Sequence, residues 1–497
     1  MKGAATAAAY VCPPPISGWN ARDTEANMKE DEARVLDNWF PDTSELRVRR
    51  GYTGFCSSLG GSVETLMEYE IGTTHKLLSA ANGEIFDITS GTASSLASGF
   101  SEDRWQTLCF GKHGFFMNGT DTMQDYDGST VADATYTGPT LSNVVGGCVF
   151  KNRVWVFEKD TQEAWYSALG GVTGAMTVFA LNEVQAFSGN IIAMNSVSTS
   201  GGTGPEDYLV IVFSTGQVVV YQGSDPGSDF QIVGVYNIAK PLGYRCMAKI
   251  GTDLVVITTQ GYVPLTSVIK ADLVNEAHIA LSDKICGAAI DAARSYGSNS
   301  GWEVMFYPRG NMILVNVPVT ATQSQQHVQN AMNKAWCRFK GINARTFCVF
   351  NDKLYFGGAD GTVYLADYGN SDNGNPIEAV GWQAFTYLKA KAFKKRITAV
   401  KVSLRTNGNI NVNVGMNMDF NTSSSTSTVS IGGNNLPRWG VARWGVDRWG
   451  GGTKTKAYTK TVNGVGYAAS LGVTAYCNGQ SLEWRDTLYL YEKGAAF

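Results

Sequence analysis

Short stretches of alternating apolar and polar residues, separated by tight turns, run through most of the chain. In "FKNRVWVFEKDTQEAWYS" (150–167), for example, two apolar stretches follow turn residues Lys151-Asn152 and a second polar turn. An alternation of period two indicates half-buried strands, and Gly, Asn and Asp are typical of the turns that join them. The pattern therefore predicts a protein built from short β-strands.

Seven such units recur along the chain. They begin near residues 70, 110, 150, 206, 249, 307 and 350. Their first turns fall about 40 to 57 residues apart, which is the spacing of a four-stranded propeller blade. One open sheet of so many strands is not expected, whereas radial repetition leaves only short, protected edges. We predict a β-propeller of six or seven blades over residues 56–370, with the fourth and sixth units the least regular.

The composition and the hydrophobic pattern of the sequence change after the last of the seven units. "YGNSDNGNP" (368–376) has the composition of a linker, and the alternation of "NINVNV" (409–414) is that of a strand with one wet face. We predict an antiparallel β-sandwich-like C-terminal domain over 371–497. Residues 1–55 are expected to form an N-terminal extended arm that leads into the propeller, because Pro13-Pro14-Pro15 favours extended backbone. The predicted fold class is all-β.

Composition narrows the class of protein. The 497 residues are 44% hydrophobic and 17% charged, include 56 glycines and carry a net charge of −3. Without a long basic block, a dedicated nucleic-acid binder is not indicated. The nine cysteines are spread singly, which favours buried thiols over disulfides or a zinc site. The N-terminal alanine run ends in prolines rather than a cleavage site, and no 18-residue apolar run is present, so we expect folding in a cytosol.

Signatures of catalysis are weak. The four histidines, His75, His113, His278 and His327, show no metal-ligand spacing. "TMQDYDG" (122–128) places Asp125 and Asp127 before Gly128 but lacks the remaining ligands of a calcium loop, so a plain Asp-Gly turn is favoured. Carboxylates such as Asp121 and Asp125 cannot be assigned as acid and base without geometry. We expect no enzyme activity, no cofactor and no metal.

The densest positive stretch comprises Lys389, Lys391, Lys394, Lys395 and Arg396. Such a cluster could contact nucleic-acid phosphates. A solvated strand face, or an ion-pair rim between subunits, is the favoured interpretation.

The stretch "PRWGVARWGVDRWGGG" (437–452) repeats Arg-Trp-Gly every five residues, a spacing that places the aromatic side chains on one face of neither a helix nor a strand. Its members are Arg438, Trp439, Arg443, Trp444, Arg448 and Trp449. Each Trp has a large apolar surface, and Trp and Arg are enriched at interface hot spots. We predict that these six residues contact another subunit. A loop that covers its own domain's core and a loop that touches a bilayer remain as alternatives.

The N-terminal stretch "GWNARDTEANMKEDEARVLDNWFPDTSELRVRRGYTGF" (18–55) resembles the opening of the tail-nozzle, or packaged-DNA stabilisation, proteins of short-tailed bacteriophages. A Gly-x-Asn-x-Arg-Asp phrase, a Leu-Asp-Asn-Trp-Phe-Pro phrase and an Arg-x-Gly-Tyr close carry the resemblance. The matching residues are Gly18, Asn20, Arg22, Asp23, Leu36, Asp37, Asn38, Trp39, Phe40, Pro41, Arg49, Gly51 and Tyr52. Beyond residue 55 the resemblance lies mainly in the general pattern of residue types, and it includes the stretches "NKAWCRF" (333–339) and "DGTVYLAD" (360–367).

The resemblance implies a structural virion protein of the phage tail. It implies a homo-hexameric ring below the portal and its adaptor, with tail adaptor and tail fibre or needle proteins as partners. Such a ring would retain packaged DNA and guide its ejection through transient, sequence-independent contact with the duplex, without stable membrane insertion. Assembly would take place in the cytoplasm of the host bacterium. The alternative is a propeller module of a phage tail that binds a host receptor or glycan.

Overall fold

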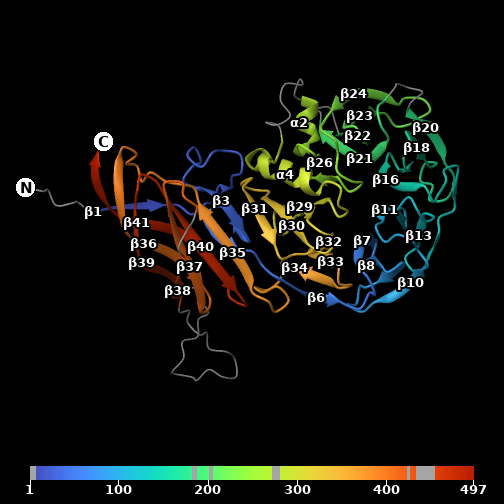
Figure 1. The fold of residues 1–497 in the computed structure, drawn as a ribbon. Coiled ribbons are helices and arrows are strands. Elements are labelled where there is room, and N and C mark those ends of the chain that lie inside the picture. Colours follow the sequence, from blue (N-terminus) through green and yellow to red (C-terminus); the bar gives the residue numbers. More distant parts are fainter. Residues whose placement is uncertain are drawn as a thin grey trace, which may run out of the picture. The chain divides into compact units, whose positions relative to one another are not determined.

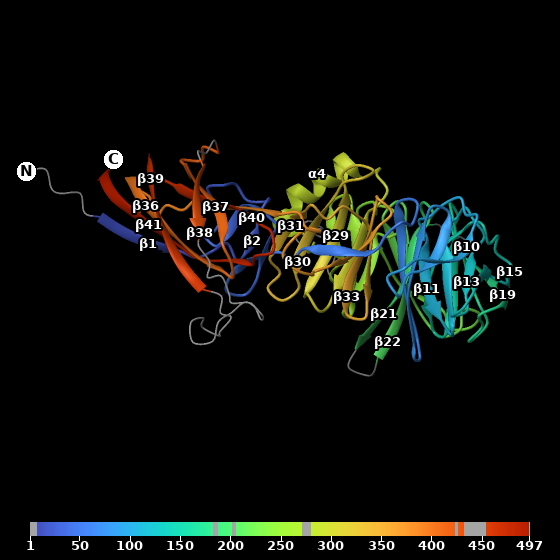
Figure 2. The same cartoon turned by 90° about the horizontal axis from the view of Figure 1, so that it is seen from below.

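The computed structural model divides the chain into two compact units (Figures 1 and 2), which we call the propeller unit and the sandwich unit. The propeller unit comprises Gly54–Gln325 and Asn343–Leu365, and the sandwich unit comprises Met1–Thr53, Gln326–Ile342 and Ala366–Phe497. The structure describes residues 7–181, 187–200, 205–270, 280–422, 426–431 and 454–496.

Six separate sheets in the described part of the propeller unit are blades, five with four strands and one with three. In chain order the first three blades are β7 (Val63–Ile71), β8 (Thr74–Ala81), β9 (Glu84–Asp87) and β10 (Ser94–Ser98); β11 (Gln106–Phe110), β12 (His113–Met117), β13 (Gln124–Tyr126) and β14 (Val131–Asp133); and β16 (Val144–Phe150), β17 (Arg153–Glu158), β18 (Glu163–Tyr166) and β20 (Thr177–Ala180). The others are β21 (Ile191–Ser200), β22 (Pro205–Phe213), β23 (Gln217–Gln222) and β24 (Gln231–Asn237); β25 (Met247–Ile250), β26 (Asp253–Thr258) and β27 (Gly261–Pro264); and β32 (Ala344–Phe350), β33 (Lys353–Gly358), β34 (Val363–Ala366) and β6 (Tyr52–Cys56).

A hairpin stands in the ring between the last two of these sheets. Its strands are β28 (Glu303–Tyr307) and β29 (Met312–Pro318), and β28 contacts β25 on one side and β32 on the other. The remaining short elements of the unit are β15 (Tyr136–Thr137), β19 (Gly174–Ala175), α2 (Leu265–Lys270), η1 (Asp283–Ile285) and α4 (Cys286–Tyr296). The all-β propeller predicted from the turn spacing is confirmed.

Aromatic side chains pack neighbouring blades against each other. Phe230, which precedes β24, lies parallel to Trp155 of β17 with ring centroids 5.5 Å apart, and parallel to Tyr221 of β23 at 5.4 Å. Phe179 of β20 meets Tyr221 edge to face at 5.4 Å. Stacked and edge-to-face pairs of this kind stabilise a core beyond the apolar area they bury. The third and fourth blades therefore share one aromatic core.

The last blade is completed by a strand from the opposite end of the propeller sequence. β6 precedes the first blade in the chain, yet it forms the outer strand of the sheet β32-β33-β34-β6. The ring is thus closed by main-chain hydrogen bonds between its two ends, which leaves no open seam between the first and last blades.

The described residues of the sandwich unit form two sheets. The first has the order β39 (Lys454–Gly466), β36 (Phe393–Thr406), β41 (Leu482–Ala496), β5 (Leu46–Val48) and β4 (Trp39–Pro41), with β1 (Ala7–Cys12) also paired to β41. The second has the order β30 (Ser324–Asn330), β31 (Trp336–Lys340), β3 (Glu32–Asp37), β35 (Ile377–Gln383), β40 (Ala469–Cys477), β37 (Ile410–Met418) and β38 (Thr426–Ile431), with β2 (Gly18–Trp19) beside β3. Gly381 of β35 faces Trp39 and Trp484 of the first sheet, each 3.2 Å from the position of an added Cβ, so the two sheets pack face to face.

The N-terminal segment differs from the expected extended arm. β1 pairs antiparallel with β41 over six residue pairs, from Ala7 opposite Glu492 to Cys12 opposite Thr487, and β3 pairs with β35. The physical reason is burial: "EARVLDNWFP" (32–41) holds too many apolar side chains to remain in water. The segment therefore supplies strands to both sheets of the sandwich unit.

A second difference concerns residues 326–342, which the sequence placed inside the propeller. They belong to the sandwich unit, where β31 lies beside β3 and Phe339 packs on Phe40 with ring centroids 6.3 Å apart. The local strand pattern was correct, but the pairing partner lies about 300 residues away in sequence.

We predict unequal costs for two glycine-to-alanine changes in hairpin turns. Gly216, between β22 and β23, has φ +97, and an added Cβ would lie 2.0 Å from the carbonyl oxygen of Ile238. Gly72, between β7 and β8, has φ +63, with nothing within 4 Å. Because Gly72→Ala meets only backbone strain, it should cost about 1 kcal/mol, and Gly216→Ala should cost at least about 3 kcal/mol. Urea unfolding of both variants measures the difference, and equal costs would contradict the turn geometry.

Candidate functional site

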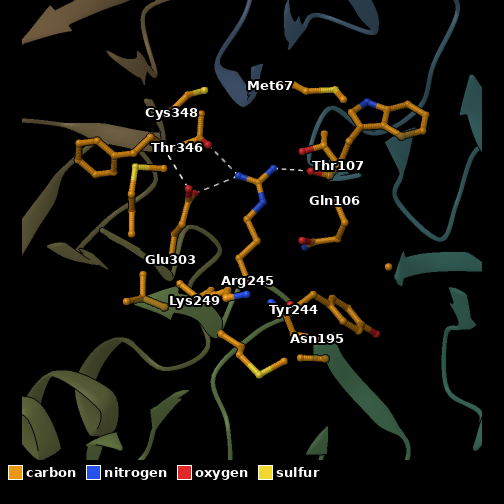
Figure 3. Close-up of a pocket in the computed structure, with 18 of the residues that line it drawn as sticks. Met67, Gln106, Thr107, Asn195, Tyr244, Arg245, Lys249, Glu303, Thr346 and Cys348 are labelled. Atoms are coloured by element: carbon orange, nitrogen blue, oxygen red, sulfur yellow. Dashed lines mark hydrogen bonds and ion pairs between the residues drawn. The ribbon is translucent and has the colours of Figure 1, made fainter. Parts of the chain in front are cut away.

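The inner strands of the propeller unit surround a cavity of about 510 Å³ (Figure 3). Every inner strand contributes to its wall: β7, β11, β16, β21, β25, β28 and β32. The lining mixes apolar residues such as Met305 with polar ones such as Gln106, Asn195 and Lys249. A concave site with a few polar groups on a rigid scaffold is the usual form of a small-molecule site, so this cavity is the candidate site of the propeller unit.

Arg245 ties several blades together at the cavity wall. Its guanidinium donates to the Glu303 carboxylate at 3.0 Å and to the Thr346 hydroxyl at 2.8 Å. It also donates to the Thr65 hydroxyl at 2.9 Å and to the carbonyl oxygen of Trp105 at 2.6 Å. These partners lie on or beside four different inner strands, β28, β32, β7 and β11. One buried cation thus fixes the spacing of the strands around the cavity.

A second ion pair joins the first and last blades. Arg345 of β32 makes a two-pronged contact with Glu64 of β7, at 2.7 Å from Nε to Oε1 and 3.2 Å from Nη2 to Oε2. Burial raises the pKa of Glu64, but the hydrogen bond and charge of Arg345, together with Ser62 and Arg104, outweigh burial and lower it. The pair therefore stabilises the ionised carboxylate and reinforces the closure of the ring.

Two titratable groups that line the cavity, Glu68 and Cys348, are shifted toward their neutral forms. Burial is the main cause of the raised pKa of the Glu68 carboxyl, and burial raises the pKa of the Cys348 thiol well above its ordinary value. The indole Nε1 of Trp105 is buried with no hydrogen-bond partner among the described residues. A neutral thiol is a poor nucleophile. Cys348 is therefore not an activated nucleophile at this wall.

The N-terminal motif residues lie in the sandwich unit, where they take part in two networks of polar side chains. In the first, Asn20 donates to Asp23 at 2.8 Å and to Glu32 at 2.7 Å, and its side-chain oxygen accepts from the backbone N–H groups of Arg22 and Asp23. Arg22 in turn pairs with Asp23 at 2.8 Å. Asn20 therefore fixes the turn between β2 and β3, in the manner of an Asx turn.

Arg49 is the centre of the second network. It is 2% exposed, and it binds both carboxylate oxygens of Asp372, at 2.8 and 2.6 Å. It also donates to the side chain of Asn38 and to the carbonyl oxygens of Arg50 and Lys340. These bonds satisfy all five guanidinium donors. Burial raises the pKa of Asp372, although Arg49 opposes this shift.

The other motif residues surround this second network. Asn38 has φ +59 and donates to the carbonyl oxygen of Glu378, and Asp37 pairs with Arg338 at 2.7 Å. Trp39 packs edge to face on Trp484, and the carbonyl oxygen of Pro41 accepts from Asn330. Three further motif residues are also in contact with this unit: Arg47 lies over the Phe40 ring at 4.8 Å, Gly51 has no room for a Cβ beside Ser371, and the Tyr52 hydroxyl donates to the carbonyl oxygen of Gly341. The motif therefore builds the sandwich unit rather than an exposed site.

The predicted subunit contact at Arg438, Trp439, Arg443, Trp444, Arg448 and Trp449 lies outside the described residues, so its interpretation stays a prediction. In the positive stretch, Lys395 is 1% exposed and its ammonium donates to the carbonyl oxygens of Ala390 and Phe393 at 2.7 and 3.0 Å. Its neighbours Lys389, Lys391, Lys394 and Arg396 are exposed. The stretch is thus partly a structural element and partly a solvated face.

The histidines and carboxylates singled out in the sequence are dispersed. His113 pairs with Asp125 at 2.8 Å across strands β12 and β13, and His327 is buried against Trp19, which lowers its pKa to about 3. Asp127 accepts hydrogen bonds from Ser129 and Thr130, as expected of a plain turn. Within the ranges the structure describes, no three His, Cys, Asp or Glu residues are grouped as a metal site would require, and no helix is long and apolar enough to cross a membrane.

We compared the chain with known proteins by sequence and by structure. The sequence matches no protein-family model and no curated protein. A solved structure of the computationally designed Ika8 protein is 13% identical with a TM-score of 0.38, covering 67% of this chain and 96% of that one. YCF48 bound to D1 peptide is 9% identical with a TM-score of 0.38, covering 66% and 96%. BBS1N in complex with ARL6DN is 14% identical with a TM-score of 0.32, covering 46% and 73%.

We expect Asp372→Ala to destabilise the sandwich unit by about 3 to 5 kcal/mol, because Arg49 would keep a buried, unpaired charge. Asp291→Ala removes a comparable carboxylate from the exposed Arg294–Asp291 pair, whose side chains are 76% and 75% exposed, and should cost less than about 1 kcal/mol. Denaturant unfolding followed by tryptophan fluorescence compares the two. If both variants lose a similar free energy of unfolding, the Arg49–Asp372 pair stabilises the sandwich unit no more than an exposed ion pair does.

We also expect the Glu64 pair to make the propeller unit sensitive to acid. The folded-state pKa of Glu64 is lowered, so its contribution is fully present above the unfolded pKa and is lost as the pH falls through the folded value. Glu64→Gln should therefore be less stable than the wild type at pH 7, and the gap should shrink below about pH 4.5. Thermal unfolding across pH 7 to 3 measures the gap. Glu70→Gln, at a side chain that is 59% exposed, is the control and should leave the profile unchanged.

Proposed function

We propose that the chain is a structural subunit of the tail of a short-tailed bacteriophage, and that its copies form the nozzle ring through which packaged DNA is retained and then ejected. The observation that supports this most is the role of the motif residues. The residues that carry the resemblance to the nozzle family, from Asn20 to Tyr52, build the interior of the sandwich unit through Glu32, Arg49 and Asp372. A resemblance that falls on fold-determining residues is consistent with a shared architecture.

The proposed partners follow from the same resemblance. They are five further copies of the chain, the tail adaptor proteins on the portal side, and a tail fibre or needle protein on the other. Contact with the duplex would be transient and independent of sequence. The exposed side chains of Lys389, Lys391, Lys394 and Arg396 are candidates for that contact, because they present positive charge to solvent.

The cavity of the propeller unit favours a second candidate function, a tail module that binds a receptor glycan. Its wall offers the amides of Gln106 and Asn195, which are groups that hydrogen-bond to sugar hydroxyls. Binding of soluble glycans by the purified chain, with loss on Gln106→Ala, would support this candidate over the nozzle.

The nozzle proposal predicts a defined ring. Purified full-length chain, alone or mixed with tail adaptor proteins, should give a six-copy mass in native mass spectrometry and closed rings in negative-stain images. A triple variant of Trp439, Trp444 and Trp449 to Ser should lose the ring while it keeps the thermal unfolding of the wild type, because the six Arg-Trp-Gly residues are predicted interface residues. Leu169→Ser, at an apolar side chain that is 66% exposed in the propeller unit, is the matched control. A chain that stays monomeric with and without adaptor proteins would refute the nozzle role.

A further inference from the structure

A second pocket of the propeller unit lies beside Arg104. Its volume is about 270 Å³, and it is lined by Arg104, Gln106, Asn118, Tyr244 and the loop 297–302, whose sequence is Gly-Ser-Asn-Ser-Gly-Trp. Gln106 and Tyr244 also line the central cavity, so the two spaces share a wall. Apart from Arg104, the polar side chains of this pocket are neutral amides and hydroxyls.

Charge in this part of the blade ring is unbalanced. Arg104, Arg245 and Arg345 lie with Glu64 and Glu303, which gives three guanidinium groups for two carboxylates. All five side chains are largely buried, with exposures between 9% and 16%. Buried charges are normally paired, because the desolvation of an unpaired charge is costly.

Both glutamates, Glu64 and Glu303, accept hydrogen bonds from arginines other than Arg104. Glu303 accepts from Arg245 at 3.0 Å, and Glu64 accepts from Arg345 at 2.7 and 3.2 Å, whereas the nearest approach of Arg104 to Glu64 is 3.6 Å. Arg104 is therefore the cation without a hydrogen-bonded counter-charge.

Two carboxylates just outside the cluster, Asp103 and Asp121, accept hydrogen bonds from groups other than Arg104. Asp103 accepts from the backbone N–H of Gly83, and Asp121 accepts from the backbone N–H groups of Ser101 and Glu102 as well as from Asn118. Burial, together with the charges of Arg245 and Arg345, lowers the pKa of Arg104 to about 10, and Glu303 and Glu64 offset only part of this effect. The surrounding carboxylates thus neutralise only part of the positive charge of Arg104.

The geometry of Arg104 leaves donors for a ligand. Of the five N–H donors of a guanidinium, two reach carbonyl oxygens, those of Arg345 at 3.1 Å and Trp302 at 3.2 Å. These two bonds hold the side chain in place against β32 and the end of the loop 297–302. A fixed guanidinium fork beside a small polar pocket matches the shape and charge of a tetrahedral or planar oxyanion.

We propose that the Arg104 pocket binds a small phosphate-type oxyanion, inorganic phosphate or a phosphate monoester. The ligand supplies the missing negative charge, accepts hydrogen bonds from Arg104, and is bordered by Gln106, Asn118 and the hydroxyls of Ser298 and Ser300. Because Arg104 donates to the carbonyl oxygen of Arg345 on β32 and Gln106 of β11 lines the pocket, the bound anion also stabilises the closed ring of blades. This site is independent of the role of the chain in a phage tail.

The test uses inorganic phosphate as the probe and the full-length chain. Isothermal titration and thermal unfolding in phosphate, at an ionic strength matched with sodium chloride, should show saturable binding and a raised unfolding temperature of the propeller unit. Arg104→Met should weaken phosphate binding by about tenfold or more, because hydrogen bonds to a charged group contribute strongly. Arg294→Gln removes an exposed positive charge from α4, which leads into the same loop, and should bind phosphate like the wild type.

A second variant keeps the test informative if Arg104→Met does not fold. Gln106→Glu places a carboxylate on the wall of the same pocket, where it can pair with Arg104. It should fold, should be at least as stable as the wild type without phosphate, and should lose the response to phosphate. Loss of phosphate binding in Gln106→Glu, and in Arg104→Met where that variant folds, with binding retained in Arg294→Gln, supports the site. Absence of saturable binding in the wild type, binding retained in Gln106→Glu, or equal stabilisation by chloride overturns it.

Discussion

The sandwich unit depends on one buried ion pair, between Arg49 and Asp372. Every donor of the guanidinium is used, and its partners come from three parts of the sequence: the N-terminal segment, the end of β31 and the segment before β35. Burying both charges is expensive unless all hydrogen bonds are made. The buried pair is therefore stable only when all three segments are in their native positions.

The propeller unit uses the same kind of interaction at its seam. Arg345 and Glu64 join the last and first blades, Arg245 joins inner strands around the cavity, and β6 supplies main-chain hydrogen bonds to the last sheet. Between the third and fourth blades the contact is instead mainly aromatic. Charged contacts at the seam have strict geometry, so they specify which two sheets meet, whereas stacking of similar aromatic rings is less selective.

Local features of the sequence were sufficient to predict the propeller. Turn residues such as Asn152 and Asp352 have positive φ in the structure, as the turn chemistry required, and each predicted hairpin turn has one strand on either side. The fourth unit is the exception in detail, because its turn at 214–216 joins the second and third strands of its blade rather than the first and second. Sequence pattern identifies hairpins but not their position within a sheet.

Long-range pairing and the candidate sites could not be read from the sequence. The strands of residues 7–48 have ordinary alternation, and nothing local indicates that their partners are β35 and β41. Arg245 stands among uncharged neighbours and Arg104 follows Glu102 and Asp103 in the sequence, so no spacing rule singled them out. Their importance arises from the ring topology, which brings residues such as Thr65, Glu303 and Thr346 to one point. The strand β6 has a further consequence for biosynthesis: it leaves the ribosome before any blade, yet its place in the sheet exists only after β34 has been made. A nascent chain must therefore keep this strand unpaired while the intervening blades emerge, and the ring closes only after β34 has been translated.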